Sequence, residues 1–228
     1  MRMRLRTNAY ERLDACGKWY IPTADEGRNV KDVIKERELL SYELLYGSNE
    51  PISLEIGCGQ GGFLCEKAKQ NPSNSYLGVE KIANVILSGA EKACSESIKN
   101  VRFLRANAEC LVKYLPENSV KEIFLNFSTP LPNKGYAKQR LTAPRYLEIY
   151  KKLLIKNGRI YQKTDDKDFF EFSLEQLQNN GFEILSKSEN LHENGEVGIV
   201  TEYERKFISL GMPIYALSAE KKGLKCTR

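Results

Sequence analysis

The 228-residue sequence has a single histidine, His192, and no two cysteines with the C-x-x-C spacing. Its cysteines are scattered, at positions 16, 58, 65, 94, 110 and 226. Zinc sites and disulfide frameworks need clustered cysteine or histidine, so we expect neither, and no metal site is predicted. A nucleophilic cysteine paired with His192 is also disfavoured, because nothing near any cysteine indicates a lowered thiol pKa. We expect Cys58, Cys65 and Cys94 to be reduced thiols that fill the core.

Long hydrophobic runs are missing as well. No apolar stretch approaches the roughly 20 residues that span a bilayer, and no apolar signal-peptide segment follows the basic start Met1-Arg2-Met3-Arg4-Leu5-Arg6. We therefore expect no membrane partner and a cytoplasmic location. The length and the hydrophobic fraction of 41% are sufficient for one well-filled α/β domain.

Acidic residues are absent between Glu122 and Glu148, where lysines, arginines and tyrosines are interspersed. This composition predicts a local basic surface that includes Lys134 and Lys138. The chain also starts with three arginines and ends in a basic tail, residues 221–228, so three segments are candidates for a phosphate-binding face. The alternative is a solvated surface with frayed ends.

Glycines cluster directly after the short apolar run Ile52-Ser53-Leu54-Glu55-Ile56, at positions 57, 59, 61 and 62. The run, the glycines and the following Phe63-Leu64-Cys65 predict a buried strand, a tight turn and a helix. Such a turn allows a ligand to approach the backbone beside the positive end of the helix. The pattern therefore predicts a cofactor site that includes Gly57 and Gly59.

The carboxylates of Glu80 and Glu55 help to identify the cofactor. Glu80 ends a second predicted strand, where it can take ribose hydroxyls, so a dinucleotide and S-adenosylmethionine both fit the glycine spacing. Glu55 favours S-adenosylmethionine, because a carboxylate there attracts its cationic groups and opposes a pyrophosphate. A glycine-rich turn that binds nothing is the third interpretation.

Strands and helices alternate along the chain and predict a doubly wound, Rossmann-like α/β fold with a mostly parallel seven-stranded sheet. The last strand follows the sixth without a long helical crossover, so we expect it to insert antiparallel, as in methyltransferases of this sheet class. Residues 1–50 are expected to form an N-terminal extension packed on the core, and residues 51–220 the methyltransferase domain. We expect strands at 52–57, 76–80, 101–107, 121–127, 159–164, 182–188 and 213–217, and helices at about 31–45, 63–70, 84–97, 109–114, 136–155 and 169–179.

Several segments carry a pattern beyond the glycine turn: LEIGCG at 54–59, GVEK at 78–81, LNFS at 125–128, AK and RLT at 137–142, KTD at 163–165, LH at 191–192, TEYERKF at 201–207 and GMPIY at 211–215. Together they resemble the bacterial tRNA (guanine-N7-)-methyltransferase family. The resemblance implies transfer of a methyl group from S-adenosylmethionine to N7 of a guanine in the variable loop of tRNA.

The resemblance also implies roles for individual residues. The donor would be bound by Glu55, Gly57, Gly59, Glu80, Asn107, Ala108 and Asn126; the catalytic residues would be Thr129, Asp165 and Glu204; and the tRNA would be bound by Asn133, Lys134, Lys138, Arg140, Asp165, Thr201 and Glu204. Carboxylates can accept from the N1–H and amino group of guanine and offset the positive charge that develops on its ring. The plainer interpretations are that Asp165 caps a helix, Glu204 is a surface carboxylate and His192 bonds to backbone in its turn.

One loop departs from the family pattern. The family has Asp-Pro-Trp-Pro after its fourth strand, and this chain has Thr129-Pro130-Leu131-Pro132. A hydroxyl thus replaces a carboxylate, and Leu131 replaces an aromatic ring. Two alternatives stay open: a catalytically impaired RNA-binding homologue, and a methyltransferase directed at another RNA or a small molecule. The sequence is compatible with a monomer or a homodimer.

Overall fold

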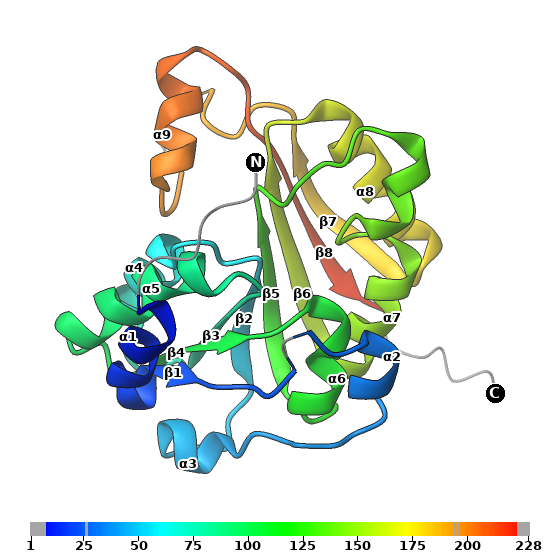
Figure 1. The fold of residues 1–228 in the computed structure, drawn as a ribbon. Helices are drawn as coiled ribbons and strands as arrows, with labels where there is room; N and C mark the ends of the chain where they lie inside the picture. The colour runs from blue at the N-terminus through cyan, green and yellow to red at the C-terminus, as the bar shows by residue number, and fades with distance from the viewer. Residues whose placement is uncertain (1–7, 26, 194, 196, 223–228) are drawn as a thin grey trace. The chain divides into compact units, whose positions relative to one another are not determined.

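The computed structural model describes residues 8–25, 27–193, 195 and 197–222 (Figure 1). The chain divides into two compact units, unit 1 up to Pro116 and unit 2 from Glu117. The described residues form eight strands, four in each unit, where the sequence predicted seven. Every helix among these residues is too short or too polar to cross a lipid bilayer. Two of the predicted phosphate-binding segments, the arginines at 2, 4 and 6 and most of the basic tail, lie outside the described residues.

Four parallel strands form the sheet of unit 1, in the order β1, β4, β3, β2. The register pairs Ile56 with Val79 and Glu80 with Arg105, so these strands end together at one edge. Ligands of open α/β sheets bind at the carboxyl ends of the strands. The strands are β1 (Tyr20–Ile21), β2 (Ile52–Ile56), β3 (Tyr76–Glu80) and β4 (Val101–Arg105).

Helices α1 (Ala9–Ala15), α4 (Gly62–Gln70) and α5 (Ala83–Ser95) gather in unit 1 near β3 and β4 (Figure 1). Phe103 lies at the centre of their contacts, because a Cβ atom at Gly61, Gly78 or Gly89 would come within 3.0 Å of its ring. These three glycines therefore serve packing. The shorter elements of unit 1 are η1 (Gly17–Trp19), α2 (Val30–Val33), α3 (Tyr42–Tyr46), η2 (Ala108–Cys110) and α6 (Leu111–Tyr114).

The single helix predicted over 31–45 is wrong: α2 and α3 are separate, with non-helical residues between them. The backbone N–H groups of Glu38 and Leu40 donate to the carbonyl oxygens of Lys113 and Tyr114, at 3.0 and 2.8 Å. A continuous helix would need those N–H groups for itself. Ser41 then starts α3, with its hydroxyl accepting from the Leu44 N–H.

The sheet of unit 2 has the strand order β5, β6, β8, β7. Strand β5 (Val120–Asn126) is parallel to β6 (Leu154–Thr164), whereas β8 (Tyr215–Lys221) is antiparallel to both β6 and β7 (Phe182–Ser188). The predicted antiparallel insertion of the last strand is confirmed. Helix α8 (Lys167–Asn179) packs on β7 and β8 (Figure 1).

The helix predicted over 136–155 is shorter than expected. Residues Lys134–Gln139 form the 3-10 helix η3, and helix α7 (Pro144–Leu153) begins only at a proline in its first turn. Proline is favoured there because its missing N–H has no partner within the helix. Helix α7 leads directly into β6, which therefore begins at Leu154 and not at Arg159.

Helix α9 (Glu202–Ser209) was not predicted. Its signal is present in the sequence as a capping box, in which the Thr201 hydroxyl accepts from the Glu204 N–H and the Glu204 carboxylate accepts from the Thr201 N–H. A Thr-x-x-Glu pattern of this kind marks helix starts.

Candidate functional site

The glycine turn after β2 has an open backbone in unit 1. Gly57 and Gly59 adopt φ angles of 73° and 57°, in the left-handed region that favours glycine. Apart from the glycine itself and its two chain neighbours, no atom of the described residues lies within 4 Å of a Cβ built at either position. The Gly57 N–H donates to the Val79 carbonyl oxygen at 2.8 Å, which joins the turn to β3. Unlike Gly61, which packs on Phe103, these two glycines leave room for a ligand beside the turn.

Two carboxylates lie near this turn. Glu55 on β2 is only 3% exposed, and Glu80 ends β3 with Oε1 accepting from the Ile82 N–H at 3.0 Å. Burial, and then the carboxylates of Glu55 and Glu80, raise the pKa of the Cys58 thiol well above its ordinary value. Their combined negative charge favours a cationic ligand and opposes a pyrophosphate. The geometry thus supports the sequence argument for S-adenosylmethionine over a dinucleotide.

A cavity of about 340 Å³ lies in unit 1, beside the residues that follow β3 and β4. Lys81 and Asn107 line it from the strand ends, and Thr23, Asp25 and Arg28 line it from the N-terminal segment. Its volume falls within the usual range of small-molecule sites. Asn107, predicted to bind the donor, is therefore a wall residue of this cavity, and Ala108 follows it as the first residue of η2.

The N-terminal wall of the cavity is anchored by Lys113, whose side chain is 2% exposed. Its Nζ donates to Asp25 at 2.8 Å and Glu36 at 3.1 Å and pairs with Glu38 at 3.3 Å. Burial alone would lower the pKa of Lys113, but hydrogen bonds to these carboxylates raise it above its ordinary value. The Tyr114 hydroxyl also donates to Asp25. Sequence reasoning missed this cluster because its members are far apart along the chain.

Four of the five described cysteines, all but Cys94, are unsuited to act as nucleophiles. Burial raises the pKa of Cys16 and Cys110 to about 11 and that of Cys65 to about 12. A buried thiol with a raised pKa stays protonated and unreactive near neutral pH. Cys65 is fully buried, as predicted for a core residue, whereas Cys94 is half-buried. No group of three or more metal-ligating side chains is found in the described part of the chain.

Glu204 is fully buried in unit 2, so its interpretation as a surface carboxylate is wrong. Its Oε1 accepts from Lys163 Nζ at 2.7 Å and lies 3.2 Å from His192 Nε2, while Oε2 accepts from the Thr201 N–H at 2.8 Å. The Val197 N–H donates to Nδ1 of His192 at 3.1 Å, as predicted for a histidine bonded to backbone. Nε2 therefore carries the proton and donates to Glu204.

Asp165 follows β6 and is not the cap of α8. That cap is Asp166, whose Oδ1 accepts from the Phe169 N–H at 2.7 Å. Asp165 is half-buried, and within the described residues its carboxylate has no hydrogen bond or ion pair. Burial, and then the charge of Asp165, raise the pKa of Tyr203 on α9. Asp165 thus offers an acceptor close to α9.

The loop and η3 that follow β5 carry the remaining predicted residues. Asn126 ends β5, and Thr129 is exposed in the loop. Lys134 and Lys138 are exposed on η3, which Asn133 caps by accepting from the Gly135 N–H at 2.9 Å. Thr129, Asn133, Lys134 and Lys138 therefore lie at the surface, whereas Asn126 is half-buried.

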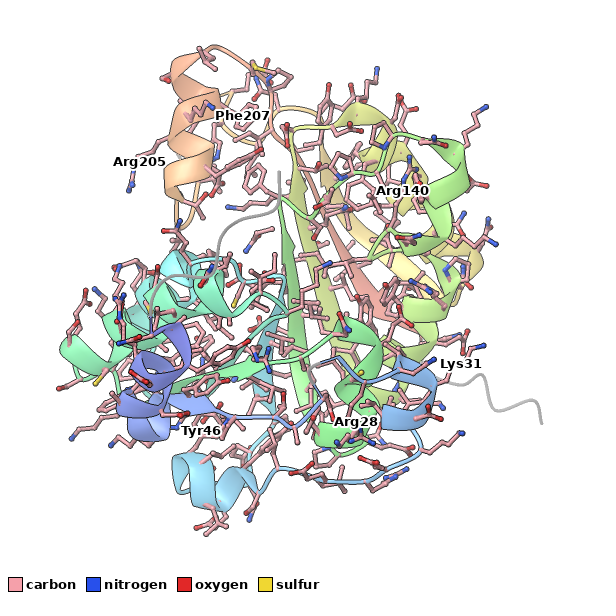
Figure 2. The ribbon with its side chains drawn as sticks, viewed as in Figure 1. Arg28, Lys31, Tyr46, Arg140, Arg205 and Phe207 are labelled. Atoms are coloured by element: carbon pink, nitrogen blue, oxygen red, sulfur yellow. The ribbon has the colours of Figure 1, made fainter. Side chains whose placement is uncertain are left out.

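Arg140, which is labelled in Figure 2, differs from these surface residues. It is only 8% exposed. Its Nε donates to the Pro130 carbonyl oxygen at 2.8 Å, and a second guanidinium nitrogen donates to the Leu131 carbonyl oxygen at 3.2 Å. The guanidinium also lies 4.6 Å from the centre of the Phe172 ring. Two nitrogens of Arg140 therefore hold the loop from inside unit 2, and its contact with tRNA phosphate stays a prediction.

Comparison with known proteins adds evidence on family and fold. Residues 49–217 match a family described as "Putative methyltransferase". A tRNA (guanine-N(7)-)-methyltransferase of Geobacillus sp. (strain WCH70) is 36% identical, with 94% of this chain and 93% of that protein covered. The protein of the same name from Lachnoclostridium phytofermentans is 41% identical, with 81% and 87% covered.

Solved structures agree on the architecture. The 16S rRNA methyltransferase KamB has a TM-score of 0.63 at 16% identity, covering 82% of this chain and 96% of that chain. An antibiotic-related methyltransferase has a TM-score of 0.57 at 18% identity, covering 90% and 98%. The predicted Rossmann-like methyltransferase fold is confirmed.

Proposed function

Because the chain belongs to the tRNA (guanine-N7-)-methyltransferase family, we propose that it transfers a methyl group from S-adenosylmethionine to N7 of a guanine in tRNA. The structural observation that carries the proposal is the open turn at Gly57 and Gly59 with the carboxylates of Glu55 and Glu80 nearby. We place the target guanine in the variable loop and the reaction in the cytoplasm, where tRNA is found. Residues 51–220 form the methyltransferase domain in this proposal.

The residues of unit 1 fit the methyl donor. Gly57 and Gly59 leave backbone open to a ligand, Glu55 supplies negative charge for a cationic one, and Glu80 offers acceptors for ribose hydroxyls. The side-chain carbonyl of Asn107 can accept from an adenine amino group at the cavity wall. When bound, S-adenosylmethionine supplies an electrophilic methyl group on a sulfonium cation. Ala108 on η2 and, in unit 2, Asn126 at the end of β5 complete the assigned donor residues.

The residues of unit 2 position the guanine. N7 carries a lone pair, so the protein holds the base and offsets positive charge on its ring, and no proton needs to be removed there. We assign direct contact with the guanine N1–H and amino group to Asp165. Glu204 keeps Thr201 and α9 in place, since both of its carboxylate oxygens accept from groups of its own unit. Asn133, Lys134 and Lys138 meet tRNA phosphates from η3.

The proposal is tested by incubating the full-length protein with tRNA and isotope-labelled S-adenosylmethionine and identifying the methylated nucleoside by mass spectrometry. We expect labelled 7-methylguanosine at one position. Asp165→Asn should lower the rate at least about ten-fold, because loss of one charged acceptor removes a charge-assisted hydrogen bond. Asp168→Asn, an exposed carboxylate on the first turn of α8, is the matched control and should leave the rate unchanged.

A substitution of Thr129 distinguishes the proposed tRNA methyltransferase from the alternative functions. Thr129→Asp should raise the rate of 7-methylguanosine formation, because a carboxylate there adds negative charge to the exposed loop. Label in a different nucleoside would favour another RNA target. Binding of tRNA without any transfer, in both the original protein and Thr129→Asp, would favour a non-catalytic RNA-binding protein.

A further inference from the structure

Three aromatic rings meet in unit 2 where the loop after β5 begins. Phe127 lies 4.8 Å from Tyr203 and 6.4 Å from Phe207, and Tyr203 lies 4.9 Å from Phe207, measured between ring centroids. Tyr203 and Phe207 are four residues apart on α9, so they share one face of that helix. Figure 2 shows Phe207 and Arg205 on different sides of α9. The rings thus form one cluster between α9 and the loop.

Backbone bonds and the buried network of Glu204 hold this cluster in place. Phe127 has a φ of 50°, which is uncommon for a bulky side chain, and its N–H donates to the Lys163 carbonyl oxygen at 2.8 Å. The side chain of the same Lys163 binds Glu204 of α9 at 2.7 Å. One residue of β6 therefore fixes both the loop ring and the helix that carries the other two.

Tyr203 is the member of the cluster that faces solvent. It is 48% exposed, whereas Phe127 and Phe207 are half-buried. A large exposed ring supported by two others resembles the stacking surfaces on which proteins hold unpaired bases. Burial, and then the nearby Asp165 carboxylate, raise the pKa of its hydroxyl, so Tyr203 stays neutral near pH 7.

We infer that Tyr203, supported by Phe127 and Phe207, is the stacking surface for the target purine, and that Tyr203 and Asp165 together bind the N7-methylated purine more tightly than the unmethylated one. The inference rests on the proposed function. Methylation uses the N7 lone pair and removes no proton, so the purine ring gains a positive charge. A cation is attracted by an aromatic face and by a carboxylate. Here the carboxylate of Asp165 is near enough for its charge to raise the pKa of Tyr203.

The inference also accounts for the loop aromatic that this chain lacks. Leu131 stands where the family pattern has tryptophan, and Arg140 holds its backbone from the interior of unit 2. Tyr203 supplies an exposed ring from α9. Preference for the charged ring means that the contact strengthens as the methyl group is transferred, which lowers the barrier to transfer.

The test compares the affinities of guanosine 5′-monophosphate and 7-methylguanosine 5′-monophosphate for the full-length protein, measured by NMR titration. We expect the methylated nucleotide to bind about five-fold more tightly than the unmethylated one. Tyr203→Phe keeps the ring and should retain this ratio. Tyr203→Leu keeps apolar bulk without an aromatic face, so the ratio should fall to about one and the methylated nucleotide should bind roughly ten-fold more weakly.

Leu210→Ala is the matched control, because Leu210 is 62% exposed just beyond α9 and belongs to no ring cluster of the described residues. It should keep the ratio of the original protein. An unchanged ratio in Tyr203→Leu, or no preference for the methylated nucleotide in the original protein, would overturn the inference. Equal urea midpoints for the variants show that they remain folded.

Steady-state methylation of tRNA separates this inference from the proposed function. Tyr203→Leu should lower kcat by a larger factor than it raises KM, because the ring acts most strongly on the charged state. If the original protein methylates tRNA and Tyr203→Leu matches it in kcat and KM, only the stacking role fails. If the original protein methylates no tRNA, the proposed function fails, and the nucleotide affinities still decide whether Tyr203 is a stacking surface.

Discussion

The two units hold their candidate site residues by different means. In unit 1 the donor residues lie at the carboxyl ends of parallel strands or just after them, and the turn at Gly57 and Gly59 is shaped by the backbone. In unit 2 the corresponding residues lie on loops and on α9, and side chains hold them, with Lys163 and Glu204 bonded across 41 positions of sequence. The turn of unit 1 is therefore encoded locally, whereas the arrangement in unit 2 depends on distant side chains.

Both units contain a buried charge, and the surroundings of the two charges differ. Unit 1 buries the cation of Lys113 beside Asp25, whose side chain is 10% exposed, and beside Glu36 and Glu38, whose side chains are 46% and 67% exposed. Two of the three partners of Lys113 therefore lie near solvent. Unit 2 buries the anion of Glu204 beside Lys163 and His192, whose side chains are only 18% and 5% exposed. Partners near solvent can be rehydrated when the central charge is removed, and buried partners cannot. Removing Glu204 should therefore cost more than removing Lys113.

The largest expected effect is that of Glu204→Ala. It leaves Lys163 and His192 without their acceptor and breaks the capping box of α9, so we expect the free energy of unfolding to fall by about 3–5 kcal/mol. Urea titration gives the total, and hydrogen exchange of the α9 amides locates the loss. Glu220→Ala, which removes a carboxylate paired with Arg159 nearer the surface, should shift the midpoint far less. Equal shifts in the two variants would show that the burial of Glu204 and its partners does not determine the loss of stability.

The next largest effect is expected for Lys113→Met in unit 1, which should lower the free energy of unfolding by about 2–3 kcal/mol. The reason is that the carboxylate of Asp25, only 10% exposed, loses the ammonium group that lies 2.8 Å from it. Trp19 is the only tryptophan of the sequence and lies in unit 1, so its fluorescence reports this unit. Asp25 also lines the cavity, so the affinity for S-adenosylmethionine, measured by calorimetry, should fall several-fold. Lys69→Met, which removes an exposed lysine paired with Glu66 and Glu96, is the control.

An unchanged donor affinity in Lys113→Met, together with the expected loss of stability, would separate the cavity from the donor site. A similar loss of affinity in Lys69→Met would show that the effect is not specific to the cavity wall.

The sequence predicted three of the four strands of unit 1 well, because each of the three is a short, largely apolar run bounded by turn residues. It missed β1, which has only two residues. Strand β3 matches its predicted range, and β2 and β4 end one or two residues earlier than expected. The helix predicted over 31–45 failed because carbonyl oxygens of Lys113 and Tyr114, distant in sequence, compete for its N–H groups. Periodicity within a segment carries no information about such partners.

The candidate residues were harder to predict than the strands. Gly59 and Gly61 look equivalent in sequence. At Gly61 a Cβ atom would collide with the ring of Phe103, whereas at Gly59 a Cβ atom would meet no neighbouring residue. The charge of Arg140 is visible in the sequence, but its burial and its backbone acceptors are not. Lys163 was given no role, although it connects Phe127 to Glu204. Each of these features depends on a partner supplied by tertiary structure.

The smallest expected effect concerns pH and unit 1. Hydrogen bonds from Arg28 and then Lys113 lower the pKa of Glu36 from its ordinary value of 4.5 to about 2. A carboxyl group with a lowered pKa in the folded state stabilises that state fully above its unfolded-state pKa, and this contribution is lost as the pH falls through the folded-state value.

The urea midpoint of the original protein, followed by Trp19 fluorescence, should therefore exceed that of Glu36→Gln at pH 6. The difference should shrink between about pH 4 and pH 2, because both side chains are then neutral. A difference that stays constant over this range would mean that Glu36 contributes through packing and not through its charge, and the cation of Lys113 would then depend on Asp25 for its main partner.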